Sequence, residues 1–441
     1  MESKKQLHLA AFMRPVTIHT GSWRYPDAVA DANFNFPLLR SLIEKLEAAC
    51  FDAFFMADHL GVLNMSMEAL RRSHTVTSFE PFTLLSALAA TTQKIGLVAT
   101  ASTTYDEPYH VARRFASLDH ISGGRSGWNI VTTSNPESAL NFGLSEQPEH
   151  GTRYARAREF YDVVTGLWDS FADDAFVRNK ESGVHFDPSR MHILNHKGPN
   201  FSVRGPLNIA RPPQGRPVIV QAGGSEAGKQ LAAETAELVF AAVPDLSAGK
   251  AFYADVKDRA EAAGRSRDSI KIAPAAFVVV ADTLCEAMSR REKLDSLVHY
   301  ESGISSLCQM LDYDVSTFDP DGPLPSIPET NANKTQRHQI LELALEPGIT
   351  IRQLAAKAGS YAGLSFVGTP ASIADSIEDW LMEEGADGFI VMFSDIPSGL
   401  NDFADKVVPE LQRRGLFRTE YHGSTLRDHL GLKRPKNRIF Q

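Results

Sequence analysis

Polar side chains follow several short apolar runs of the chain, at the points where each run ends. Asp58 and Thr104 come just after two such runs, and Asn129 and Thr133 lie in and just after a third. Carboxylate, hydroxyl and amide groups grouped at strand ends are typical of a ligand site in α/β proteins. Asp58 alone is explained equally well as a cap for the loop that follows it.

A tight turn followed by a helix start forms a second candidate site. Gly223 and Gly224 permit the turn, and Ser225 begins a segment rich in helix-forming residues. Free N–H groups at a helix start, together with a serine hydroxyl, can hold a phosphate. The same residues also fit an ordinary N-cap without a ligand. The pattern is neither a dinucleotide fingerprint nor a Walker motif.

His150 and Tyr154 are four residues apart in a helical pattern, so they should lie on one face. Both could reach a phosphate or a hydroxyl group, although an exposed helix start explains them as well. Three further histidines, His185, His192 and His196, invite a zinc interpretation. Proline, asparagine and glycine residues among them argue against a regular helix, and no acidic ligand motif accompanies them, so we expect no metal site.

The elements that must position these side chains alternate between apolar runs and helical patterns. This alternation predicts a parallel sheet, and eight runs predict a closed (β/α)8 TIM barrel whose carboxyl face binds ligands. The predicted strands are 7–12, 53–57, 95–101, 127–131, 218–221, 238–241, 272–280 and 387–392.

Three stretches are longer than ordinary connections between strands and helices. They comprise residues 59–80, 171–216 and 283–366. We expect a single domain over 1–441 with these long insertions at the C-terminal face of the barrel. The insertion 283–366 has a centre rich in Pro, Asp and Gly at 318–328, and it is the lid candidate.

Composition excludes several classes of protein. The 441 residues are 43% hydrophobic, which is enough for a large core, and the net charge of −9 argues against nucleic acid and anionic membranes as partners. The three cysteines lie far apart, without metal or disulfide spacing. No signal-peptide pattern and no apolar run of spanning length is visible, so we expect a cytoplasmic protein.

In combination, these motifs resemble those of the bacterial-luciferase-like flavin monooxygenases. The resemblance is closest to the branch that contains nitrilotriacetate, dibenzothiophene-sulfone and long-chain alkane monooxygenases. It is carried by the segment STTYDEPYHVARRFASLDHISGGRSGWNIVTTSN at 102–135, by QAGGSEAG at 221–228 and by the Glu-His-x-x-x-Tyr motif that begins at Glu149.

The resemblance implies a site for FMN. Reduced FMN would be a cosubstrate with molecular oxygen, and a flavin hydroperoxide would oxygenate a small organosulfur, organonitrogen or xenobiotic-like substrate by hydroxylation or by C–S or C–N cleavage. Candidate catalytic residues are His19, which is shifted by one position from the family pattern, and Thr133. The implied cofactor-binding residues are Asp58, Thr104, Asn129, His150, Tyr154 and Ser225.

The resemblance also implies partners. No nicotinamide-binding fingerprint is visible, which fits a separate NAD(P)H:flavin reductase that supplies reduced FMN. The resemblance further implies a homodimer or homotetramer. Three alternatives stay open: a deazaflavin-dependent oxidoreductase of the same superfamily, a non-catalytic flavin-binding protein, and a phosphosugar isomerase barrel.

Overall fold

Eight parallel strands form the closed barrel, as predicted. A computed structural model describes residues 5–14, 17–329 and 334–440. Every predicted strand lies within one residue of its observed bounds. The barrel strands are, in order around the wall, β1 (His8–Met13), β2 (Ala53–Met56), β3 (Gly96–Ser102), β4 (Ser126–Val131), β7 (Val218–Gln221), β8 (Leu238–Ala241), β9 (Lys271–Val280) and β11 (Gly388–Phe393).

Strand β9 closes the barrel because it pairs with a neighbour on each side. Its first residues pair with β8, with Leu238 opposite Lys271, and its middle pairs with β11, with Ile390 opposite Ala275. A short strand that the sequence patterns missed, β10 (Ser365–Gly368), pairs with the last residues of β9. It lies at the end of the third insertion and extends the sheet beyond the barrel wall.

Helices surround the wall. The first, α1 (Phe36–Ala48), buries Leu39, Leu42, Ile43 and Leu46 on one face, as its apolar spacing dictates. The other helices that connect successive strands are α3 (Pro81–Ala89), α4 (Pro108–Ser122), α5 (His150–Trp168), α6 (Glu226–Thr235), α7 (Leu246–Ala262) and α12 (Pro370–Met382). After β11 come α13 (Ser398–Asp402), the π-helical turn η6 (Phe403–Val407) and α14 (Val408–Arg413).

Side chains alternate between the two faces of each barrel strand, so they contribute to two separate hydrophobic cores. In β1, Leu9 and Ala11 belong to the cluster that packs between wall and helices, whereas Ala10 and Phe12 point into the barrel. Both sets are buried, which explains why the strands are apolar throughout.

Two of the insertions follow strands and therefore lie at the carboxyl end of the barrel. Residues 59–80 follow β2 and contain α2 (Met67–Leu70). Residues 283–366 follow β9 and contain α8 (Leu284–Asp295), α9 (Tyr300–Leu311), α10 (Lys334–Leu343) and α11 (Ile351–Ser360). The two insertions touch, because the Gln309 side chain donates to the Asn64 carbonyl at 3.1 Å.

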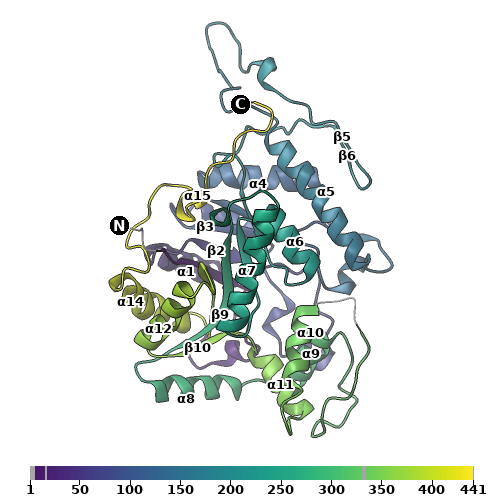
Figure 1. Cartoon of the computed structure of the whole chain (residues 1–441), viewed down its shortest axis with the longest axis vertical. Coiled ribbons are helices and arrows are strands. Elements are labelled where there is room, and N and C mark those ends of the chain that lie inside the picture. The colour runs from purple at the N-terminus through teal and green to yellow at the C-terminus, as the bar shows by residue number, and fades with distance from the viewer. Residues whose placement is uncertain (1–4, 15–16, 330–333, 441) are drawn as a thin grey trace.

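The insertion 171–216 lies at the other end, which differs from the expectation that all three occupy the carboxyl face. It connects the end of α5 to the start of β7, so it belongs to the amino end of the barrel. It carries the hairpin of β5 (His196–Lys197) and β6 (Ser202–Val203). Figure 1 shows this arm and the C-terminus at the top, with α8, α9, α10 and α11 at the bottom.

The C-terminal segment closes the amino end of the barrel. Leu426, the first residue of α15 (Leu426–His429), is fully buried among the barrel-interior side chains. A Cβ on Gly96 would lie 2.5 Å from a Leu426 methyl, so glycine at the start of β3 makes room for this leucine. The Arg427 guanidinium pairs with Glu237 at 2.5 Å and fixes the helix.

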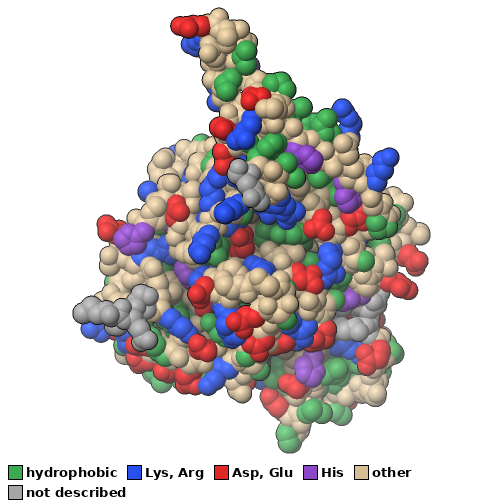
Figure 2. Space-filling view, turned by 45° about the horizontal axis from the view of Figure 1, so that its top comes forward, with side chains coloured by type: hydrophobic (Ala, Val, Ile, Leu, Met, Phe, Trp, Pro, Cys, Tyr) green, Lys and Arg blue, Asp and Glu red, His purple; other side chains and the backbone are tan. Residues whose placement is uncertain are grey.

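The surface carries both signs of charge. Figure 2 shows acidic and basic side chains interspersed over the visible face, with the arm projecting from it. Among the described residues, no helix combines the length and the apolar character needed to cross a bilayer.

Replacing Leu426 with Ala should open a cavity at the amino end of the barrel. We expect a loss of about 2–5 kcal/mol in the free energy of unfolding, measured by urea denaturation. Leu345→Ala is the matched control, because Leu345 is 82% exposed, and it should change stability by less than about 0.5 kcal/mol. Equal effects of the two substitutions would contradict the conclusion that Leu426 fills the amino end of the barrel.

Candidate active site

A chain of hydrogen bonds crosses three neighbouring strands inside the barrel. The Thr100 hydroxyl of β3 donates to the Met56 carbonyl of β2 at 2.9 Å, and the Asn129 amide of β4 donates to Thr100 Oγ1 at 2.9 Å. Asn129 is 3% exposed, and its Oδ1 has no partner among the described residues. A buried carbonyl oxygen without a donor is costly, so this atom calls for a ligand with an N–H or O–H group.

The ends of β3 and β4 are joined by their hydroxyl groups. Ser102 Oγ and Thr133 Oγ1 lie 2.7 Å apart, and the Thr104 hydroxyl donates to the Thr132 carbonyl at 2.9 Å. Thr133 adopts φ 51°, a left-handed conformation that is uncommon for threonine. The predicted residues Thr104, Asn129 and Thr133 thus come together at one part of the rim.

Two arginines that the sequence patterns did not single out hold this part of the rim. Arg153 donates to the carbonyls of Thr132, at 3.2 Å, and Thr133, and Arg156 donates to the Thr103 carbonyl at 3.0 Å. Both come from the first turns of α5. The only signal in the sequence was their place beside the Glu-His-x-x-x-Tyr motif, and helical arginines are usually solvent-exposed.

Asp58 is a half-buried acidic group just after β2. Burial, together with the nearby carboxylates of Glu80 and Asp106, raises the pKa of Asp58 to about 6. Its side chain accepts one hydrogen bond, from the His59 amide at 2.8 Å. A half-buried carboxylate with so few donors is able to accept a hydrogen bond from a ligand.

The start of α6 forms a turn with free backbone amides. Ser225 is the N-cap, and its hydroxyl accepts from the Gly228 amide at 3.2 Å. No described residue accepts from the four successive amides at 224–227. A Cβ on Gly223 would lie 2.8 Å from Gly228 Cα, so glycine at both positions lets turn and helix touch. Together with the helix dipole, four free N–H groups suit a phosphate.

His150 and Tyr154 share one face of α5, as their spacing predicted, with ring centroids 4.7 Å apart. The ion pair of Arg158 with Glu234, at 2.6 Å, joins α5 to α6 about two turns after the start of each helix. The starts of the two helices are therefore level, and His150 and Tyr154 lie at the same end of the barrel as Ser225.

His19 is placed differently from the other predicted residues. It is fully buried, its Nδ1 accepts from the Gly21 amide at 3.1 Å, and its Nε2 lies 3.1 Å from Asp295 of α8. Burial lowers the pKa of His19, which keeps the ring neutral with its proton on Nε2. Proton transfer by His19 would require one of these two hydrogen bonds to open.

The histidines of the arm do not form a cluster. His196 Nε2 lies 2.9 Å from a Glu159 oxygen of α5. No group of three or more potential metal ligands occurs among the described residues.

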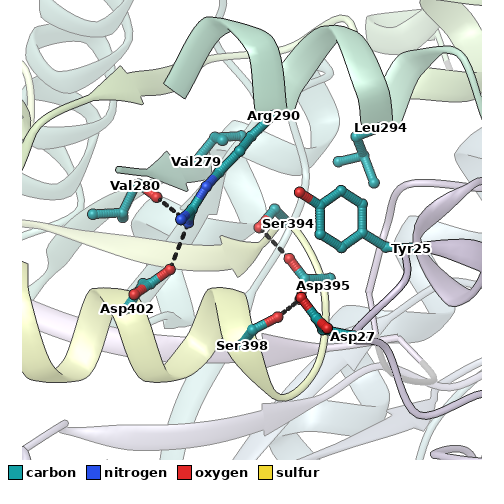
Figure 3. A pocket seen from close by; sticks show the side chains of 10 residues that line it. All are labelled: Tyr25, Asp27, Val279, Val280, Arg290, Leu294, Ser394, Asp395, Ser398 and Asp402. Atoms are coloured by element: carbon teal, nitrogen blue, oxygen red, sulfur yellow. Dashed lines mark hydrogen bonds and ion pairs between the residues drawn. The ribbon is translucent and has the colours of Figure 1, made fainter. Parts of the chain in front are cut away.

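A pocket of about 140 Å³ lies apart from these residues, at the carboxyl ends of β9 and β11 (Figure 3). Several of its polar groups satisfy one another, since Arg290 donates to Asp402 at 2.8 Å and Ser394 donates to Asp395 at 2.8 Å. Its lining residues are Tyr25, Asp27, Val279, Val280, Arg290, Leu294, Ser394, Asp395, Ser398 and Asp402. None of the predicted site residues is among them.

Comparison with known proteins decides which family uses this arrangement. The family model described as luciferase-like monooxygenase matches residues 12–388. The chain belongs to the luciferase-like monooxygenases. The resemblance inferred from the motifs is therefore confirmed, and with it an enzyme of the flavin-dependent monooxygenase class.

Two curated relatives match over all or nearly all of the chain. Nitrilotriacetate monooxygenase component A from Aminobacter aminovorans is 47% identical over 100% of this chain and 99% of its own length. N-acetyl-S-(2-succino)cysteine monooxygenase from Bacillus subtilis is 47% identical over 99% of this chain and 98% of its own length. Monooxygenases for dibenzothiophene sulfone and long-chain alkanes also match, which confirms the branch.

Among solved structures, a riboflavin lyase with modified FMN and riboflavin as substrate superimposes with a TM-score of 0.89. It is 31% identical, and the match covers 98% of this chain and 97% of that one. The fold of nearly the whole chain, insertions included, is thus shared with a protein whose structure contains modified FMN.

Because the pKa of Asp58 is raised, this residue should lower the free energy of unfolding at neutral pH. Because the folded-state pKa is about 6, its ionisation costs stability as the pH rises from about 4 to 6. Asp58→Asn removes that cost, so the variant should be more stable than the parent by about 1–3 kcal/mol at pH 7.

The measurement is urea denaturation of both proteins at pH 4 and pH 7, where the gain should be absent and present respectively. Asp379→Asn, on the exposed side of α12, is the control and should give no pH-dependent difference. A gain of the same size at both pH values would contradict a raised pKa at Asp58.

Proposed function

We propose that this protein is the oxygenase of a two-component system, which uses reduced FMN and molecular oxygen to oxygenate a small organic substrate. The observation that carries the proposal is the rim of the barrel. There, an anion-binding helix start at Ser225 and an unpartnered buried oxygen on Asn129 belong to neighbouring strands, β7 and β4.

The donor set fits FMN at both ends of the cofactor. The free amides at 224–227 and the Ser225 hydroxyl would hold the phosphate, with His150 and Tyr154 alongside. Asn129 Oδ1 and the Asp58 carboxylate would accept from ring N–H groups. Thr104, tied to the Thr132 carbonyl, would line the same part of the rim.

Bound reduced FMN supplies the electrons with which molecular oxygen is activated for transfer to the substrate. The protein would exclude water from the site of that reaction and orient the substrate toward the cofactor. The insertions 59–80 and 283–366 meet over the carboxyl end, through Gln309 and Asn64, and would form the cover. Thr133, held by Ser102 Oγ at 2.7 Å, would present its backbone turn to the reacting side of the ring.

The substrate class follows from the relatives as a proposal. Two relatives at 47% identity are named for nitrilotriacetate and N-acetyl-S-(2-succino)cysteine, which supports an organonitrogen or organosulfur compound. A separate NAD(P)H:flavin reductase would supply the reduced flavin, and we propose a homodimer or homotetramer. A deazaflavin-dependent oxidoreductase would need no oxygen, so oxygen uptake with reduced FMN separates the two functions.

Ser225→Ala should weaken FMN binding. The substitution removes one hydrogen bond to a charged phosphate, worth about 1.5–3 kcal/mol, so the dissociation constant for FMN should rise about tenfold or more. Fluorescence titration of FMN measures it. Thr369→Ala is the matched control, because Thr369 caps α12 with the same 3.2 Å bond from a backbone amide but lies away from the site. Unchanged FMN affinity in Ser225→Ala would refute the phosphate assignment.

Reduction of FMN should require a second protein. With FMN bound and oxygen excluded, NADH or NADPH alone should bleach the flavin no faster than in free solution, because no nicotinamide site is expected. Stopped-flow absorbance measures the rate, with addition of a flavin reductase as the positive control. Rapid bleaching without reductase would mean that the chain binds the nicotinamide itself.

A further inference from the structure

An arginine at the carboxyl end of the barrel carries a charge that no described residue neutralises in an ion pair. Arg14 directly follows β1, and its Nε donates to His59 Nε2 at 2.6 Å. Among the described residues it forms no ion pair, and its two terminal nitrogens make no hydrogen bond. The buried guanidinium groups of this protein donate either to a carboxylate, as Arg418 does to Asp52, or to several backbone carbonyls, as Arg125 does. A half-buried guanidinium without such partners, at a ligand-binding rim, is well placed to bind an anion.

The histidines beside Arg14 cannot supply that anion. His59 accepts from the guanidinium and is neutral, because burial and the charge of Arg14 lower its pKa to about 3. His74 Nε2 donates to the Thr17 carbonyl at 3.2 Å, which leaves its buried Nδ1 without a donor. Asp58, one residue before His59, has a raised pKa, as expected of a carboxylate that no cation neutralises.

The geometry leaves one end of the guanidinium free. Since His59 holds Nε, the two terminal nitrogens remain as a planar pair of donors. Such a pair matches the two oxygens of a carboxylate, which arginine binds in a bidentate manner. Burial lowers the pKa of Arg14 only to about 10, so the group stays cationic at neutral pH.

The position of Arg14 excludes the flavin phosphate as its partner. The phosphate-binding turn follows β7, and β1 lies four strands away from β7 in either direction around the barrel. Arg14 is therefore on the opposite side of the rim, after the strand that neighbours β2, on the ring side of the proposed FMN site. An anion held there would belong to the substrate.

We propose that Arg14 binds a carboxylate group of the substrate, with His59 fixing the plane of the guanidinium. The proposal rests on the proposed function for the identity of the rim as the substrate site. It defines the substrate further, as a small carboxylic acid whose charged end lies at β1 while its reacting atom faces the flavin.

The test is calorimetric titration of the full chain, loaded with FMN, at low ionic strength. The probes are acetate, succinate, nitrilotriacetate, sulfate and uncharged succinamide. We expect saturable binding of succinate or nitrilotriacetate but not of succinamide. Arg14→Met should weaken this binding about tenfold to a hundredfold, and Arg14→Lys should restore part of it, because lysine keeps the charge but not the bidentate fork.

Arg71→Met is the control for a general loss of positive charge. Arg71 lies in the neighbouring insertion, pairs with Glu68 at 3.2 Å and is largely exposed, so its removal should leave carboxylate binding unchanged. The FMN dissociation constant, measured on the same samples, should be equal in the parent and in the Arg14 variants, which also shows that the variants are folded.

Three outcomes would overturn the proposal: no saturable carboxylate binding by the parent, equal binding by Arg14→Met, or sulfate binding as tight as that of succinate. Failure of the parent to bind FMN would count against the proposed function instead. If Arg14→Met loses carboxylate binding but keeps FMN binding, the result supports a carboxylate subsite at Arg14.

Discussion

Closure of the barrel through β9 is the constraint on which the rest of the structure depends. The ten residues of β9 pair with β8 at the start of the strand and with β11 in its middle. Every described barrel strand therefore has a hydrogen-bonded neighbour on both sides. Because all the barrel strands are parallel, closure brings their carboxyl ends to one rim. Asp58, Asn129 and Ser225, far apart in the sequence, thereby come to share one end of the molecule.

The fold could be predicted from the sequence wherever local patterning decides it. Apolar runs buried on both sides gave the barrel strands within one residue, because a parallel strand tolerates few polar positions. The strand β10 was missed, since four residues at the end of a long insertion carry no distinct periodicity. The insertion 171–216 was assigned to the carboxyl face because residue composition does not tell which end of a barrel a connection occupies.

The site was predictable in part, for a related reason. Polar residues directly after apolar strands, and a glycine turn before a helix, are local signals, and they led to Asn129, Thr104 and Ser225. Arg153 and Arg14 were missed because their importance lies in burial and in what they contact, and neither can be read from neighbours in the chain. The position of His19, with both nitrogens engaged, also depends on a residue nearly three hundred positions away, Asp295.

The leucine that fills the amino end of the barrel has a consequence for biosynthesis. Leu426 packs against Gly96, at the start of β3, and the nearby Tyr421 hydroxyl donates to the Phe51 carbonyl at 2.6 Å. During synthesis, the amino end of the barrel cannot be filled until Leu426 has left the ribosomal exit tunnel. Any barrel that assembles before these residues are available has an open apolar end, to which chaperones have access.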